Sequence, residues 1–82
     1  MMTPAQCRAA RALLDMTQSQ LAERAALGLS TVVDFEKERR QVSEEAVKII
    51  RDALEEAGIE FISENGEKVG LLARRPRPRR RK

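Results

Sequence analysis

The residues from Ser43 to Gly58 carry the clearest periodic pattern in this 82-residue chain. Apolar side chains at Val47, Ile50 and Leu54 recur every three or four positions, which places them on one face of an α-helix. Ser43 is a favoured N-cap residue, and Gly58 is a favoured residue just after a helix end. The pattern predicts an amphipathic helix whose apolar face must be buried against other elements.

Three shorter helical blocks precede this helix, over residues 4–14, 18–25 and 29–38. Pro4 suits the first turn of the first block. Thr17 and Gln20 have the spacing of a capping box, which marks the start of the second block. We expect a single hydrophobic core that contains Leu21, Val32, Phe35, Val47, Ile50 and Leu54.

After Gly58 the pattern changes from helical to extended. Residues 59–72 contain two short apolar runs around an Asn65-Gly66 turn signal, which predicts a β-hairpin. An isolated two-stranded hairpin is marginal in water. It must therefore dock on a helix or pair with a second copy, and a homodimer formed through this hairpin is one solution.

The last nine residues hold seven of the sixteen cations and no acid; the cations are Arg74, Arg75, Arg77, Arg79, Arg80, Arg81 and Lys82. The other 73 residues therefore carry a net charge of −4. Prolines interrupt the basic segment, and we expect it to be disordered. It would serve as a nonspecific phosphate anchor, as a docking strand for an acidic partner, or have no function. The chain thus divides into a folded domain over residues 4–73 and a tail over residues 74–82.

The composition argues against catalysis. The chain has no His and one Cys, which removes imidazole bases, a disulfide framework and the usual zinc ligand sets. Cys7 lies in an Ala-rich helical block, and we expect it to be a small buried hydrophobe. We find no apolar run of membrane-spanning length and no signal sequence. We therefore expect a cytoplasmic protein that is not an enzyme and uses no metal or cofactor.

The two central helical blocks also resemble a known family. The residues Thr17-Gln18-Ser19-Gln20-Leu21-Ala22 are followed by Leu27-Gly28-Leu29-Ser30-Thr31-Val32-Val33-Asp34-Phe35-Glu36. This pattern resembles the Cro/C1-type, or XRE-family, helix-turn-helix regulators over about residues 5–57. The resemblance implies an all-α domain of four helices, to which the hairpin and the tail are appended.

The resemblance implies roles for single residues. Gln18 matches a position at which the family contacts a backbone phosphate, and Arg39 and Arg40 are further phosphate-contact candidates. Arg11 and Glu36 match an ion pair between two helices of the family, which we interpret as scaffold.

Ala26 stands where the family usually has glycine. If φ is positive there, alanine costs about 1 kcal/mol relative to glycine. Gly28 is close enough to relocate the bend instead.

The face that the family uses for recognition has an unusual composition, with Leu29, Ser30, Val33, Asp34 and Lys37. None of the first four can form the bidentate donor contacts by which Arg, Lys, Asn and Gln read bases. Leu29 and Val33 predict an apolar patch that could contact a thymine methyl group or a protein. In addition, Asp34, Glu36 and Glu38 outnumber Lys37, which predicts local negative charge that opposes a phosphate surface.

Two functions of different class follow from this sequence. The chemistry of the face favours a small regulator that binds and inhibits a protein partner such as a transcription activator, similar in kind to the quorum-sensing antiactivators. The alternative is a homodimeric repressor that binds DNA sequence-specifically through two recognition helices.

Overall fold

The computed structural model describes residues 2–64 and 68–73 of the chain, with side chains as far as Phe61. In that part of the chain, the elements in order are α1 (Pro4–Leu14), α2 (Gln18–Ala25), α3 (Leu29–Glu36), α4 (Glu44–Glu56), β1 (Ile59–Glu64) and β2 (Lys68–Ala73). The predicted all-α, four-helix domain with a C-terminal hairpin is confirmed. The turn at residues 65–67 and the tail at residues 74–82, which we expected to be disordered, lie outside the described residues.

Side-chain caps fix where the helices begin. At α2 the Thr17 hydroxyl accepts from the Gln20 amide at 3.0 Å, and the Gln20 side chain accepts from the Thr17 amide at 2.9 Å. The same reciprocal pair occurs at α1 between Thr3 and Gln6, at 3.1 and 2.8 Å. This first box was missed at the level of sequence, although Thr3 and Gln6 have the same spacing as the second pair. Ser43 caps α4 as predicted, by accepting from the Ala46 amide.

The third helix is shorter than predicted. It ends at Glu36, and Lys37 is its C-cap. Glu38 has φ 55°, in the left-handed region, so it cannot continue a right-handed helix as the prediction to residue 38 required. The early end leaves Lys37, Glu38 and Arg39 in an exposed connection to α4.

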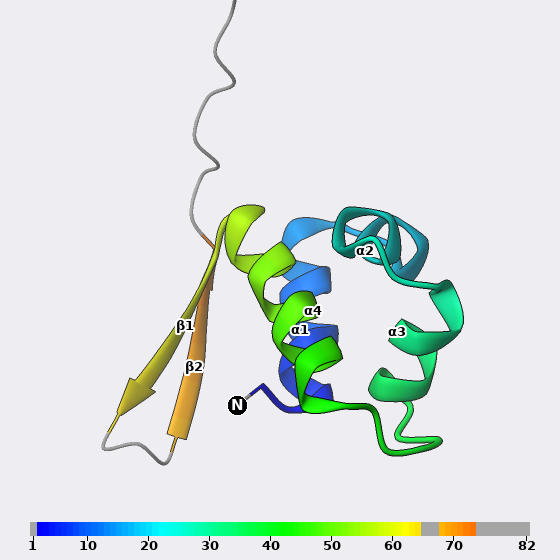
Figure 1. Cartoon of the computed structure of the whole chain (residues 1–82). Helices are drawn as coiled ribbons and strands as arrows, with labels where there is room; N and C mark the ends of the chain where they lie inside the picture. Colours follow the sequence, from blue (N-terminus) through cyan, green and yellow to red (C-terminus); the bar gives the residue numbers. More distant parts are fainter. Residues whose placement is uncertain (1, 65–67, 74–82) are drawn as a thin grey trace, which may run out of the picture.

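A single core joins the four helices. All six predicted core residues are buried in it, together with Cys7, Ala10 and Ile59. Figure 1 shows α2 and α3 on one side of the pair α1 and α4, and the hairpin on the other side. The outer surface of α3 therefore lies away from the hairpin.

The hairpin docks on the helices through both strands, with β1 against α4 and β2 against α1. The strands are antiparallel, with Ile59 paired to Ala73 and Glu64 paired to Lys68. Ile59 is buried, and the Arg51 guanidinium lies 4.7 Å from the centre of the Phe61 ring. In the described part of the chain, the helices are too short or too polar to cross a membrane.

The structure decides between the two alternatives that the sequence left open for the turn after α2: Ala26 is left-handed, and Gly28 has φ −68°. Ala26 caps this helix with φ 57° and ψ 40°, a left-handed conformation that glycine adopts without a steric penalty. We expect Ala26→Gly to raise the free energy of unfolding by about 1 kcal/mol in urea denaturation. Ala12→Gly, in the exposed face of α1, should lower it by about 1 kcal/mol. Equal signs for the two substitutions would show that Ala26 carries no strain.

Candidate nucleic-acid and partner interface

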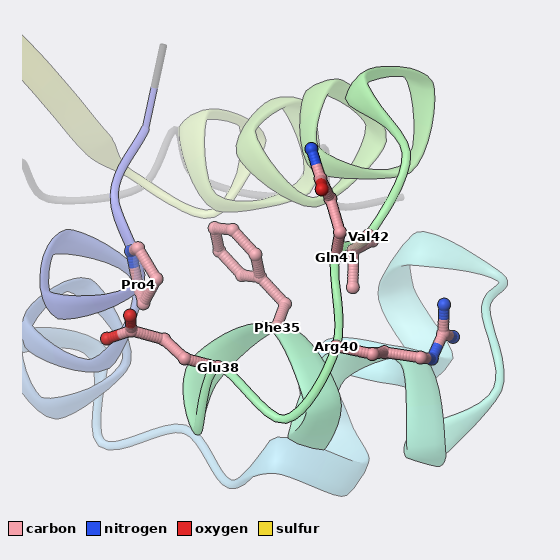
Figure 2. Close-up of a pocket in the computed structure, with 6 residues that line it drawn as sticks. All are labelled: Pro4, Phe35, Glu38, Arg40, Gln41 and Val42. Carbon is pink, nitrogen blue, oxygen red and sulfur yellow. The ribbon is translucent and has the colours of Figure 1, made fainter.

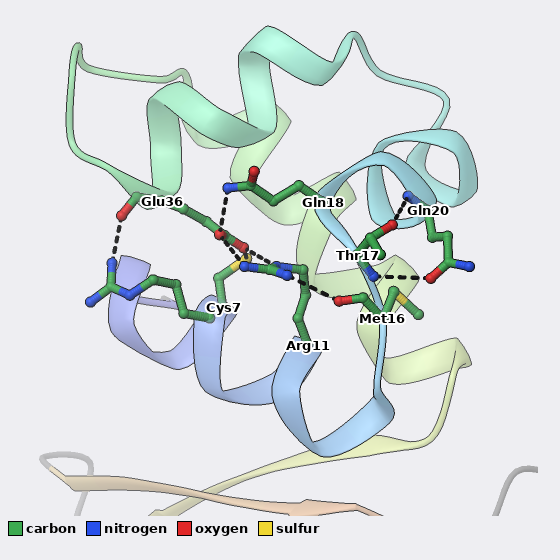
Figure 3. Close-up of polar contacts among 8 residues, drawn as sticks. Cys7, Arg11, Met16, Thr17, Gln18, Gln20 and Glu36 are labelled. Atoms are coloured by element: carbon green, nitrogen blue, oxygen red, sulfur yellow. Dashed lines mark hydrogen bonds and ion pairs between the residues drawn. The ribbon is translucent and has the colours of Figure 1, made fainter.

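A buried carboxylate organises the inner side of the helix-turn-helix. The Glu36 side chain, at the end of α3, is 1% exposed. Arg11 of α1 holds it in a two-pronged contact, with Nε 2.7 Å from Oε2 and Nη2 2.7 Å from Oε1 (Figure 3). Planar, charge-assisted pairs of this kind are stronger and more directional than hydrogen bonds between neutral groups.

Further donors converge on Glu36 from α1 and α2. Cys7 Sγ donates to Oε2 at 3.0 Å, and Gln18 Nε2 donates to Oε1 at 3.0 Å. Arg8 donates to the Glu36 backbone carbonyl, and Arg11 Nη1 also donates to the Met16 carbonyl at 3.0 Å. We call Cys7, Arg11, Gln18 and Glu36 the Glu36 cluster. It ties α1, α2 and α3 together, as Figure 3 shows.

The charges of the Glu36 cluster are fixed by these contacts. Burial alone would raise the pKa of Glu36, but hydrogen bonds from Arg11, Cys7 and Gln18 outweigh it and lower that pKa below its ordinary value. The hydrogen bond to Glu36 raises the pKa of Arg11. Burial, followed by the neighbouring carboxylate, raises the pKa of the Cys7 thiol far above its usual range. The expectation that Cys7 is only a small hydrophobe was therefore incomplete, because its neutral thiol is also a buried hydrogen-bond donor.

The lowered pKa of Glu36 predicts acid sensitivity. An unfolded chain titrates its Glu residues near pH 4.3, whereas folded Glu36 releases its proton at a lower pH. The unfolded state therefore binds more protons at low pH, so the stabilisation is complete above about pH 4.3 and is lost as pH falls through the folded pKa.

Urea unfolding between pH 7 and pH 3 measures this loss, and Glu36→Gln is the control because it cannot titrate. We expect the free energy of unfolding to fall more steeply below about pH 4.3 in the natural chain than in the variant. Identical pH dependence in the two chains would contradict the assignment.

The outer face of α3 carries the residues that the sequence singled out. Leu29 is 46% exposed, Ser30 and Lys37 are exposed, and Val33 and Asp34 are half-buried. Ser30, Val33 and Lys37 follow a helical spacing, and Leu29 lies beside Val33 one turn away. We call Leu29, Ser30, Val33, Asp34 and Lys37 the α3 face.

The local negative charge predicted for this region is wrong. Glu36 is buried and neutralised by Arg11, so it does not reach the surface. Asp34 Oδ2 accepts from Arg40 Nε at 2.8 Å, and this pair also carries no net charge. The three charged residues that directly follow α3, Lys37, Glu38 and Arg39, sum to +1. A count of charged residues along the sequence misses this, because it does not include the ion pairs that Asp34 and Glu36 form with Arg40 and Arg11.

The three phosphate-contact candidates have different surroundings. Gln18 is half-buried and its side-chain amide donates inward to Glu36. Arg40 is 54% exposed but is paired with Asp34. Arg39 is exposed in the connection after α3. Arg39 is therefore the candidate whose side chain is exposed in this connection without a described ion pair. Arg40 is on the surface in an ion pair, and the Gln18 side chain points inward to the Glu36 cluster.

A groove of about 380 Å³ lies between the start of α1 and the segment that follows α3. Figure 2 shows the Phe35 ring and the side chains of Pro4, Glu38, Arg40, Gln41 and Val42 around it. Its lining pairs no nucleophile with a base. In the described residues, no three Cys, Asp or Glu side chains are grouped closely enough to hold a metal ion.

The fold and the α3 face together define the class of protein. Two short helices joined by a tight turn, with the second exposing its outer face, form a helix-turn-helix. A family model described as helix-turn-helix matches residues 8–60. The chain therefore belongs to the Cro/C1-type helix-turn-helix family, a family of DNA-binding transcription regulators. A search of curated proteins gave no match.

Proposed function

We propose that this chain is a transcription regulator that binds DNA sequence-specifically through the α3 face. The observation that carries the proposal is the internal pairing of Asp34 with Arg40 and of Glu36 with Arg11. That pairing removes the repulsion that would otherwise oppose a phosphate surface. The family match supports the same function. The negative charge that favoured a protein partner at the level of sequence is cancelled by these two pairs.

The proposal assigns the remaining parts of the chain to positioning on the duplex. Lys37 and Arg39 are exposed next to α3 and would contact phosphates, whereas Arg40 stays paired with Asp34. We further propose that the chain forms a homodimer through the hairpin at residues 59–72, because helix-turn-helix dimers bind two half-sites about 34 Å apart, one DNA turn. In this proposal residues 4–73 recognise the site, and the basic tail at residues 74–82 adds sequence-independent affinity.

A gel shift at physiological salt tests the proposal. It compares the duplex DNA upstream of the gene that encodes this chain, called the natural duplex, with a scrambled duplex of equal composition. The full chain and a chain that ends at residue 73 should both retain the natural duplex preferentially. The shorter chain should bind more weakly, and its affinity should fall less steeply with salt. The logarithmic slope should be smaller by about 0.9 for each phosphate that the tail neutralises in the full chain. Equal retention of the two duplexes by both chains would contradict sequence-specific binding.

The α3 face also supports a second candidate function, that of an antiactivator that binds a transcription activator. Leu29 is 46% exposed, and the face lacks bidentate donors at its first four positions. An exposed aliphatic side chain on a recognition surface also suits a hydrophobic groove on a protein.

Photo-cross-linking in cells separates the two candidates. A photoreactive amino acid replaces Leu29 in one variant, and Leu13 in the control, because Leu13 is 53% exposed on α1. A DNA adduct that forms from position 29 and not from position 13 favours the first function. An adduct with one transcription activator that forms from position 29 and not from position 13 favours the second.

A further inference from the structure

We infer that α3 recognises thymine through its 5-methyl group, and that Leu29 and Val33 make this contact. The inference rests on the proposed DNA-binding function and specifies what the α3 face reads. It makes the preferred site one with A·T pairs at the positions that these two side chains reach. This kind of recognition requires no bidentate hydrogen-bond donor on the helix.

The geometry of the two side chains supports the inference. Leu29 and Val33 are four residues apart on α3, so they are neighbours on one face of the helix. Leu29 is 46% exposed, and Val33 is half-buried beside it. Together they present a short aliphatic ridge along the first two turns of α3.

The chemistry of the major groove selects the partner of such a ridge. Each base presents hydrogen-bonding groups there, and the only apolar group is the thymine methyl. An aliphatic side chain against an amino or carbonyl group would leave that group without its water partner, which is costly. Leu29 and Val33 would therefore favour a thymine over the other bases at the positions they cover.

The other members of the α3 face do not override this preference. A carboxylate can accept from the cytosine amino group, but the Asp34 carboxylate already accepts from Arg40 at 2.8 Å. The Ser30 hydroxyl both donates and accepts, so it fits several bases. Lys37 is the C-cap that follows α3 and contacts phosphates in the proposed function, so discrimination between bases is left to Leu29 and Val33.

Uracil in place of thymine tests the inference, because the two bases differ only by the methyl group. Duplexes are first selected with the full chain from a random 20-base-pair library and compared with the unselected pool. The enriched sequences are then synthesised with deoxyuridine in place of thymine. One set of duplexes carries a single substitution at each thymine in turn, and one duplex carries all of them. Each contacted methyl should be worth about fourfold in affinity. Full substitution should therefore weaken binding about fifteenfold per half-site if each side chain contacts one methyl.

Matched variants locate the effect. Leu29→Ala should reduce the preference for thymine over uracil duplexes from about fifteenfold to about fourfold per half-site, which is the share of Val33, whereas Leu13→Ala should keep the full difference. Leu13 suits this comparison because it lies two residues after Arg11, about 200° around α1 from the side chain that faces α3.

Selected duplexes that bind equally well with thymine and with uracil would overturn the inference and leave the proposed function in place. Failure of the selection to enrich any sequence would overturn the proposed function, and the inference with it.

Discussion

Replacing Glu36 with alanine is expected to lower the free energy of unfolding by about 3–5 kcal/mol. The substitution removes the acceptor of Arg11, Cys7 and Gln18 at once. Arg11 is only 19% exposed, so it would be left as a poorly solvated cation, and the Cys7 thiol would lose its buried partner. Breaking one side of a buried pair costs far more than the net value of the pair.

The control for this prediction is Asp34→Ala, which breaks the other ion pair of α3. Arg40 is 54% exposed in that pair, so the cost should be below about 1 kcal/mol. Urea unfolding in a stabilising osmolyte measures both variants, because Glu36→Ala is expected to be partly unfolded in plain buffer. Similar small losses for the two substitutions would show that the Glu36 cluster does not hold the helices together.

Phe35→Ala is expected to destabilise the domain by about 3–5 kcal/mol, which is comparable to the total stability of a domain of this size. Phe35 is 9% exposed and belongs to the core that joins the four helices. Leu13→Ala removes a side chain that is 53% exposed and should change stability little. Thermal unfolding followed by circular dichroism compares them, and an unchanged midpoint in Phe35→Ala would refute the core assignment.

Local signals in the sequence placed the helices except for the end of α3, which was predicted two residues too late. The capping pair Thr17 and Gln20 and the Ser43 cap depend on residues three apart, so they can be read without the fold. The apolar period of α4 indicated its buried face in the same way. The family's glycine position left two alternatives for the turn, a positive φ at Ala26 or a bend relocated to Gly28, and the structure has the first.

The charge state of the candidate site could not be predicted from local signals. Cys7 and Gln18 meet Glu36 from positions 29 and 18 residues away, and only the packing of three helices brings these side chains together. Arg40 returns to Asp34 because Glu38 reverses the chain with a positive φ. A count of acids along α3 therefore produced the wrong sign for the surface.

The central claim is that the α3 face binds DNA sequence-specifically, and a pair of matched substitutions tests it most directly. Leu29→Asp and Leu13→Asp each exchange an exposed leucine for one negative charge, and Asp is well tolerated in the first turn of α3. Fluorescence anisotropy with a selected duplex gives the affinity of each full-length variant. We predict a loss of at least about tenfold for Leu29→Asp and a much smaller loss for Leu13→Asp. Equal affinities for the two variants would contradict the claim.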